Sequence, residues 1–211
     1  MPSTSPFLEI KDFQFQKEAW NCWPTCIKNI LSALQKKYPK CPNPSVHVIN
    51  KTIGSFHGFP KVPSMVTPTM NEKILKKKGF EMKEESNMSF EKLKNLIEDK
   101  NKSYPIVSVS PEYFDEMERK FGRKKLGYYT QGKSTIDHTI IILDIEEEEI
   151  TFFDPYTPFF HRKEKNVPER AIFKLPKALF LDLWSEAKRS YRWAMWIERI
   201  SQKRIEEYQE G

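Results

Sequence analysis

The chain has 211 residues and a formal net charge of +6, from 35 basic and 29 acidic residues. Hydrophobic residues make up 38% and charged residues 30%, which predicts one globular domain over 1–211 with a sizeable core. The basic excess is spread along the chain and is opposed by acidic runs such as Glu146 to Glu149. Because no recognised binding motif accompanies this charge, nucleic-acid binding is disfavoured.

Three cysteines, an odd number, argue against a disulfide framework and favour a reducing compartment. The first 20 residues hold no apolar signal-peptide core, and no apolar run is long enough for a membrane span. We therefore expect a cytoplasmic protein. His47, His57 and His161 lack metal-ligand spacing with a cysteine, and Cys22-x3-Cys26 alone is a weak zinc pattern, so we expect no metal and no cofactor.

The first half of the chain predicts helices with one strand. After an extended segment at 9–16, the apolar periodicity predicts a helix over 22–37, which ends before a proline-rich connection. Further elements are expected as a short helix from 45, an irregular loop up to 68, a helix over 69–78 closed by Gly79, a strand over 80–85 and a helix capped by Ser89.

The second half predicts mostly strands. A buried strand at 104–110 precedes a charged and aromatic segment, 111–134, which we interpret as an insertion with a short helix and a flap. Two strands follow, His138 to Ile145 and Glu149 to Phe153, joined by an acidic turn. The tail is expected to form a largely helical stretch over 171–190 and a strand over 191–200. Helices first and mainly antiparallel strands afterwards indicate an α+β fold.

Cys22 stands at the predicted start of the first helix. Pro24 fits the first turn of a helix, where the missing N–H costs nothing. Backbone N–H groups and the helix dipole favour a thiolate at this end. Cys22 is therefore the candidate nucleophile, whereas Cys26, one turn later, is expected in the core and is the alternative nucleophile.

A cysteine nucleophile needs a base, a group that orients the base, and donors for the developing oxyanion. His138 opens one predicted strand and Asp154 closes the next, so an antiparallel turn would bring them side by side. Gln16, six positions before Cys22, could donate its amide to the oxyanion beside the backbone N–H of Cys22. A strand-end histidine with a purely structural role, and a turn formed by Asp154 with Pro155, are the alternatives for that pair.

These residues resemble papain-like cysteine peptidases, and in particular the branch that cleaves double-glycine leader peptides in bacteriocin export, together with its free-standing relatives. The resemblance is carried by a glutamine six residues before a Cys-Trp helix start, and by PIVSV at 105–109, HTIII at 138–142 and DP at 154–155. It implies a papain-like fold, in which the helix with the cysteine packs on a sheet with the histidine and the aspartate. It also implies Cys22 as nucleophile, His138 as general base, Asp154 as orienting group and Gln16 as oxyanion donor.

The predicted function is a cysteine-dependent hydrolase, a peptidase that acts on a peptide or protein substrate. Deamidation, isopeptide cleavage or acyl transfer to an amine would use the same residues. The alternatives from other classes are a catalytically inactive binding module on this fold and a basic adaptor that binds nucleic acid or a partner protein. Trp23 and Asn21 flank Cys22 and are expected to line the substrate cleft.

Overall fold

The computed structural model describes residues 13–15, 21–56, 59–60, 66–99, 101–121, 137–156, 172–187 and 191–200. Of the predicted extended segment at 9–16, residues 13–15 are described and belong to neither a helix nor a strand. The remainder of that segment lies outside the described residues. Within the described part of the chain, no helix is long and apolar enough to cross a membrane.

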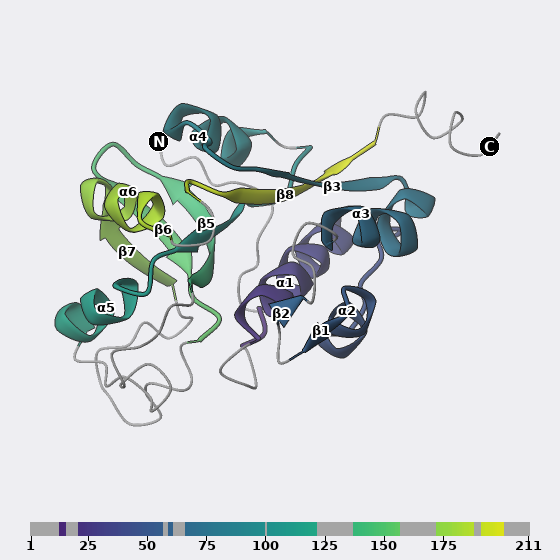
Figure 1. Ribbon diagram of the computed structural model, residues 1–211. Coiled ribbons are helices and arrows are strands. Elements are labelled where there is room, and N and C mark those ends of the chain that lie inside the picture. The colour runs from purple at the N-terminus through teal and green to yellow at the C-terminus, as the bar shows by residue number, and fades with distance from the viewer. Residues whose placement is uncertain are drawn as a thin grey trace.

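A six-stranded sheet, antiparallel throughout, forms the centre of the fold (Figure 1), and its strands follow the order β3-β8-β4-β5-β6-β7. The sheet confirms the α+β prediction and the strands expected near 80–85, 104–110, 138–145, 149–153 and 191–200. The bounds of the strands are β3 Phe80–Glu85, β4 Ile106–Val109, β5 His138–Ile145, β6 Glu149–Phe153, β7 Ile172–Pro176 and β8 Ala194–Arg199. A separate two-stranded hairpin consists of β1 Ser55–Phe56 and β2 Phe59–Pro60.

Six α-helices accompany these strands in the described residues. Their bounds are α1 Cys22–Lys37, α2 Val46–Thr52, α3 Val66–Met70, α4 Phe90–Glu98, α5 Tyr113–Phe121 and α6 Lys177–Ser185. The side chain of Ser89 accepts a hydrogen bond from the backbone N–H of Lys92, which confirms the predicted cap of α4.

Helices pack on both sides of the sheet. The first helix, α1, packs against β5, while α6 packs against β4, β6 and β7. Figure 1 shows α1 on one side of the strands and α6 on the other. Covering on both sides explains why the first six residues of β5 are all buried, since a strand with both faces covered needs a continuous apolar run.

The helix predicted over 69–78 begins earlier, at Val66, and changes its hydrogen-bonding pattern. It is α-helical over Val66–Met70, a π-helix over Asn71–Leu75 and a 3-10 helix over Lys76–Lys78. The expected irregular loop up to 68 is therefore wrong at its end, because Pro68 is tolerated in the first turn of a helix. Gly79 ends the helix with a left-handed φ of 79°, as predicted.

Asn71 of this helix covers the edge strand β3. Its side-chain oxygen accepts the backbone N–H of Met82 at 2.6 Å, and its amide donates to the Met82 carbonyl at 2.9 Å. A strand at the edge of a sheet otherwise leaves such groups unpaired. The side chain of Asn71 therefore takes the place of a further strand at this point.

The prediction of a mainly helical stretch over 171–190 is wrong for its first part, because Ile172–Pro176 forms the strand β7. Phe173 and Leu175 are buried whereas Lys174 and Pro176 are exposed, which is the two-residue period of a half-covered strand. Pairing with β6 outweighs the helical tendency that continues into α6.

The segment 111–134 begins with the predicted short helix, which is α5. Residues 122–134, where the flap was expected, lie outside the described residues. The extent of the domain, 1–211, stays a prediction.

Candidate active site

Cys22 is the first residue of α1, as the sequence predicts. The backbone N–H of Thr25 makes the first helical hydrogen bond, to the carbonyl of Asn21 at 3.1 Å. Pro24 lies inside this first turn. The N–H groups of a first turn have no partner within the helix, and together with the dipole they favour negative charge. The side chain of Cys22 thus begins at the electropositive end of α1, and the residue is only 6% exposed.

His138 and Asp154 come together at one end of the sheet. His138 is the first residue of β5, and Asp154 follows the last residue of β6, which pairs with β5 in antiparallel register. The Nε2 atom of His138 lies 2.8 Å from Oδ1 of Asp154. Both residues are completely buried. The spacing of the two strands in the sequence predicted this juxtaposition.

The sulfur of Cys22 lies against the start of β5. Its Sγ is 3.8 Å from Oγ1 of Thr139, the residue after His138. One turn along α1, the Cys26 thiol donates to the backbone carbonyl of Thr139 at 3.5 Å. These contacts fix α1 across β5, and they place Cys22 beside His138.

Cys22 and His138 shift each other's pKa. Burial disfavours the charged form of the Cys22 thiol and by itself raises its pKa. The hydrogen bond and positive charge of His138, together with hydrogen bonds from Thr139, outweigh burial, so the pKa of Cys22 lies below the ordinary 9.0. Burial by itself lowers the pKa of His138, yet the Asp154 carboxylate and the Cys22 thiolate outweigh it and raise the pKa from 6.5 to about 9. The two opposite shifts favour a thiolate beside an imidazolium over a neutral thiol beside a neutral histidine.

The other two cysteines have the opposite character. Burial, and the negative charges of Cys22 and Asp154, raise the pKa of Cys26 well above its ordinary value. Burial raises the pKa of Cys41 to about 12. All three cysteines are free thiols, and only Cys22 has a lowered pKa.

Aromatic side chains surround His138. Tyr113 of α5 stacks on its ring, with centroids 5.3 Å apart and planes at 24°. Phe114 approaches at 4.9 Å and Tyr156 at 6.0 Å. The Tyr113 hydroxyl donates to Oδ2 of Asp154 at 2.8 Å, and the backbone N–H of Tyr156 donates to Oδ1 at 2.8 Å.

Sequence reasoning missed this aromatic surround, because it treated 111–134 as an insertion. Val109 pairs with His138 across β4 and β5, so the helix that follows β4 begins beside the histidine. That proximity depends on the register of two strands that are about thirty residues apart in the chain. The signal in the sequence is the aromatic pair Tyr113 and Phe114 shortly after β4, because β4 pairs with the strand that carries the histidine.

The remaining predicted site residues have different outcomes. Gln16 lies outside the described residues. Asn21 is buried at the N-cap of α1, where its side-chain oxygen accepts the amide of Asn50 at 3.2 Å. Trp23 is half-buried and meets Trp193 edge-on at 6.2 Å. Both flank Cys22 in the chain, and their role in a cleft stays a prediction.

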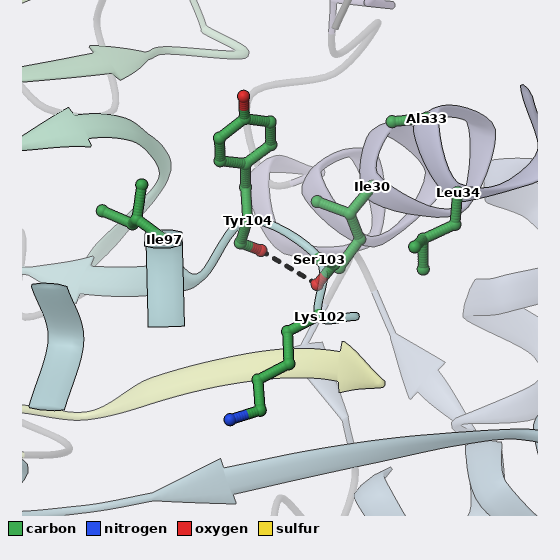
Figure 2. Close-up of a pocket in the computed structure, with 7 residues that line it drawn as sticks. All are labelled: Ile30, Ala33, Leu34, Ile97, Lys102, Ser103 and Tyr104. Carbon is green, nitrogen blue, oxygen red and sulfur yellow. Dashed lines mark hydrogen bonds between the residues drawn. The ribbon is translucent and has the colours of Figure 1, made fainter. Parts of the chain in front are cut away.

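A cavity in the described part of the chain lies further along α1. Figure 2 shows Ile30 and Leu34 of α1 on its wall, opposite Lys102 and Tyr104. The wall carries no thiol, imidazole or carboxylate, and Ile30 is more than two helical turns from Cys22. We therefore assign this cavity no part in the chemistry at Cys22. Over the described ranges, no three His, Cys, Asp or Glu side chains are grouped so that they could hold a metal ion.

Two solved structures are similar to this chain. The crystal structure of a C39-like protein from Bacillus anthracis is similar over 94% of this chain and 98% of that chain, with a TM-score of 0.56 and 12% identity. The peptidase domain of Streptococcus ComA, a bi-functional ABC transporter involved in a quorum-sensing pathway, is similar over 88% of this chain and 96% of that domain, with a TM-score of 0.49 and 13% identity. A search of curated proteins gives no match.

The likeness to the Bacillus structure shows a shared fold, which is the papain-like fold that the sequence implied. A family model, the Peptidase_C39 like family, matches residues 10–191, a range that includes Cys22, His138 and Asp154. This match covers most of the 211 residues. The chain therefore belongs to the Peptidase_C39 like family.

Proposed function

We propose that the protein is a cysteine peptidase in which Cys22 is the nucleophile, His138 the general acid and base, and Asp154 the residue that orients His138. The observation that carries this proposal is the buried contact of 2.8 Å between His138 Nε2 and Asp154 Oδ1, beside a thiol whose pKa is lowered. Family membership supports a peptide substrate.

The contact with Asp154 determines what the other ring nitrogen can do. A carboxylate accepts a hydrogen bond, so Nε2 carries a proton and Nδ1 is the nitrogen that exchanges a proton with Cys22. His138 Nδ1 is buried, and no nitrogen or oxygen atom of the described residues forms a hydrogen bond with it. It is thus available to the thiol and later to the leaving group.

The reaction begins with the thiolate–imidazolium pair. The Cys22 sulfur attacks the carbonyl carbon of the scissile peptide bond and forms a C–S bond, while the carbonyl oxygen becomes an oxyanion. The backbone N–H of Cys22, in the first turn of α1, and the side chain of Gln16 donate to that oxygen. The C–N bond then breaks as His138 gives its proton to the leaving amine, and an acyl thioester remains.

Water completes the cycle. His138, now neutral, accepts a proton from the attacking water, and the oxygen bonds to the thioester carbon. The C–S bond breaks and the carboxylic acid product leaves. Cys22 returns as thiolate and His138 as imidazolium, so one peptide bond and one water are consumed.

The test uses Cys22→Ala with Cys26→Ala as a matched control, since both thiols lie on α1 and contact Thr139. A quenched-fluorescent library of unstructured peptides reports cleavage, and mass spectrometry identifies the products. We expect cleavage by the wild type and by Cys26→Ala, and none by Cys22→Ala. Equal cleavage by Cys22→Ala and the wild type would refute the proposal, and release of ammonia without chain cleavage would replace it with deamidation.

A further inference from the structure

We propose that Tyr113 is a positioning residue of this site, which holds the Asp154 carboxylate in the rotamer that faces His138 and covers the His138 ring. The inference deepens the proposed function and rests on it. Tyr113 is completely buried, and it lies on α5, outside the set of residues that the sequence pointed to.

The hydrogen bonds on Asp154 give the first argument. Its Oδ1 atom receives His138 Nε2 and the backbone N–H of Tyr156, both at 2.8 Å, whereas Oδ2 receives the Tyr113 hydroxyl at 2.8 Å. The terminal torsion of an aspartate is broad, so each hydrogen bond to the carboxylate narrows the range over which it can turn. The Tyr113 hydroxyl adds such a restraint at Oδ2, the oxygen that does not face His138, and thereby helps to keep Oδ1 directed at His138.

The stacked ring gives the second argument. The Tyr113 ring is close to parallel with the His138 ring, at 24° and 5.3 Å between centroids. The face of an aromatic ring is electronegative and favours a cation above it, so this stack favours the imidazolium over neutral histidine. Phe114 covers the ring from a second direction at 4.9 Å and leaves less room for water. In such a low-dielectric setting the His138–Asp154 hydrogen bond is stronger than it would be in water.

The backbone fixes the position of Tyr113. Its N–H donates to the carbonyl of Ser110 at 3.0 Å, directly after β4, and the N–H of Ser110 donates to the carbonyl of Leu183 on α6 at 2.9 Å. Since Val109 pairs with His138, the start of α5 is tied to the strand beside the histidine. The tyrosine is therefore placed by the sheet itself.

A buried tyrosine with a satisfied hydroxyl could serve packing alone, so the test must separate the two roles. Tyr113→Phe removes the hydroxyl and keeps the ring. We would measure the second-order rate of iodoacetamide alkylation of Cys22 from pH 4 to 10, in the full chain, with the label located by mass spectrometry. Thermal unfolding followed by circular dichroism confirms that each variant is folded.

The variant is combined with Asp154→Asn in a double-mutant cycle. We expect Tyr113→Phe to slow alkylation at pH 6 by roughly tenfold in the wild-type background, equivalent to about 1.4 kcal/mol, and by less than about twofold in the Asp154→Asn background. Tyr38→Phe is the matched control, because Tyr38 packs on Phe80 at the far end of α1, and we expect its pH profile to coincide with that of the wild type.

Two outcomes would overturn the inference. One is a Tyr113→Phe profile that coincides with the wild type. The other is an equal slowing in both backgrounds, which would mean that Tyr113 does not act through Asp154. A wild-type Cys22 that reacts no faster at pH 6 than an ordinary thiol would instead refute the proposed function, and the inference with it.

Discussion

Asp154→Asn tests the electrostatic basis of the site. The substitution keeps the size of the side chain and removes the negative charge that acts on His138. Burial by itself lowers the pKa of His138, while the charge and the hydrogen bond of Asp154 raise it. Without the carboxylate, burial is opposed only by Cys22, so the pKa of His138 falls from about 9.

The size of the effect follows from the protonation of the two groups. With a pKa of about 9, roughly 99% of His138 carries a proton at pH 7, whereas at the ordinary value of 6.5 roughly a quarter does. Loss of the imidazolium removes the main influence that lowers the pKa of Cys22, which then rises toward 9.0. A thiol with that pKa is ionised to only about one part in a thousand at pH 6.

Alkylation by iodoacetamide measures this directly, since only the thiolate reacts. We expect the midpoint of the Cys22 pH profile to rise by at least about one unit in Asp154→Asn, and the rate at pH 6 to fall at least about tenfold. Asp182→Asn removes an equal charge from an exposed position on α6 and should match the wild type. A Cys22 midpoint in Asp154→Asn within about 0.3 units of the wild type would refute the reasoning, because a tenfold change in equilibrium corresponds to about one unit.

Two further predictions follow from the same contacts. Peptide cleavage should decline as the pH rises through about 9, because His138 then loses the proton that the leaving amine needs. It should also decline in acid, where the Cys22 thiolate takes up a proton at a pKa below the ordinary 9.0. A cleavage rate that still climbs between pH 9 and 10 would contradict this profile. Asn71→Ala should lower the free energy of unfolding by about 2–4 kcal/mol, since the N–H and C=O of Met82 both lose their partner; urea denaturation measures this loss, and an unchanged midpoint would show that Asn71 does not stabilise the edge of β3.

Local patterns in the chain determined much of the fold. The proline in the first turn and the apolar periodicity placed the start of α1 at Cys22. The run that opens with His138 and the next run that ends before Asp154 gave the bounds of β5 and β6. An antiparallel turn between adjacent strands then leaves one arrangement for their ends, which is why His138 and Asp154 could be paired without coordinates.

Short segments were less predictable. Ile172–Pro176 carries a period-two pattern of only five residues, and the neighbouring helical pattern obscured it. The segment is a strand because its backbone pairs with β6, and this pairing becomes available only in the folded sheet. Likewise, the change to a π-helix begins at Asn71, whose side chain pairs with Met82 of β3, and no local pattern in the chain indicates that pairing.

The sequence by itself located Cys22, His138 and Asp154, the residues of the proposed site, because each lies at the end of an element whose periodicity is visible in the chain. The tertiary structure decided what surrounds them. Tyr113 and Phe114 reach His138 only because β4 pairs with β5 in one register, and β4 lies between β5 and the C-terminal strand β8. Strand order and register are long-range properties, set by the burial of whole faces, and no local pattern encodes them.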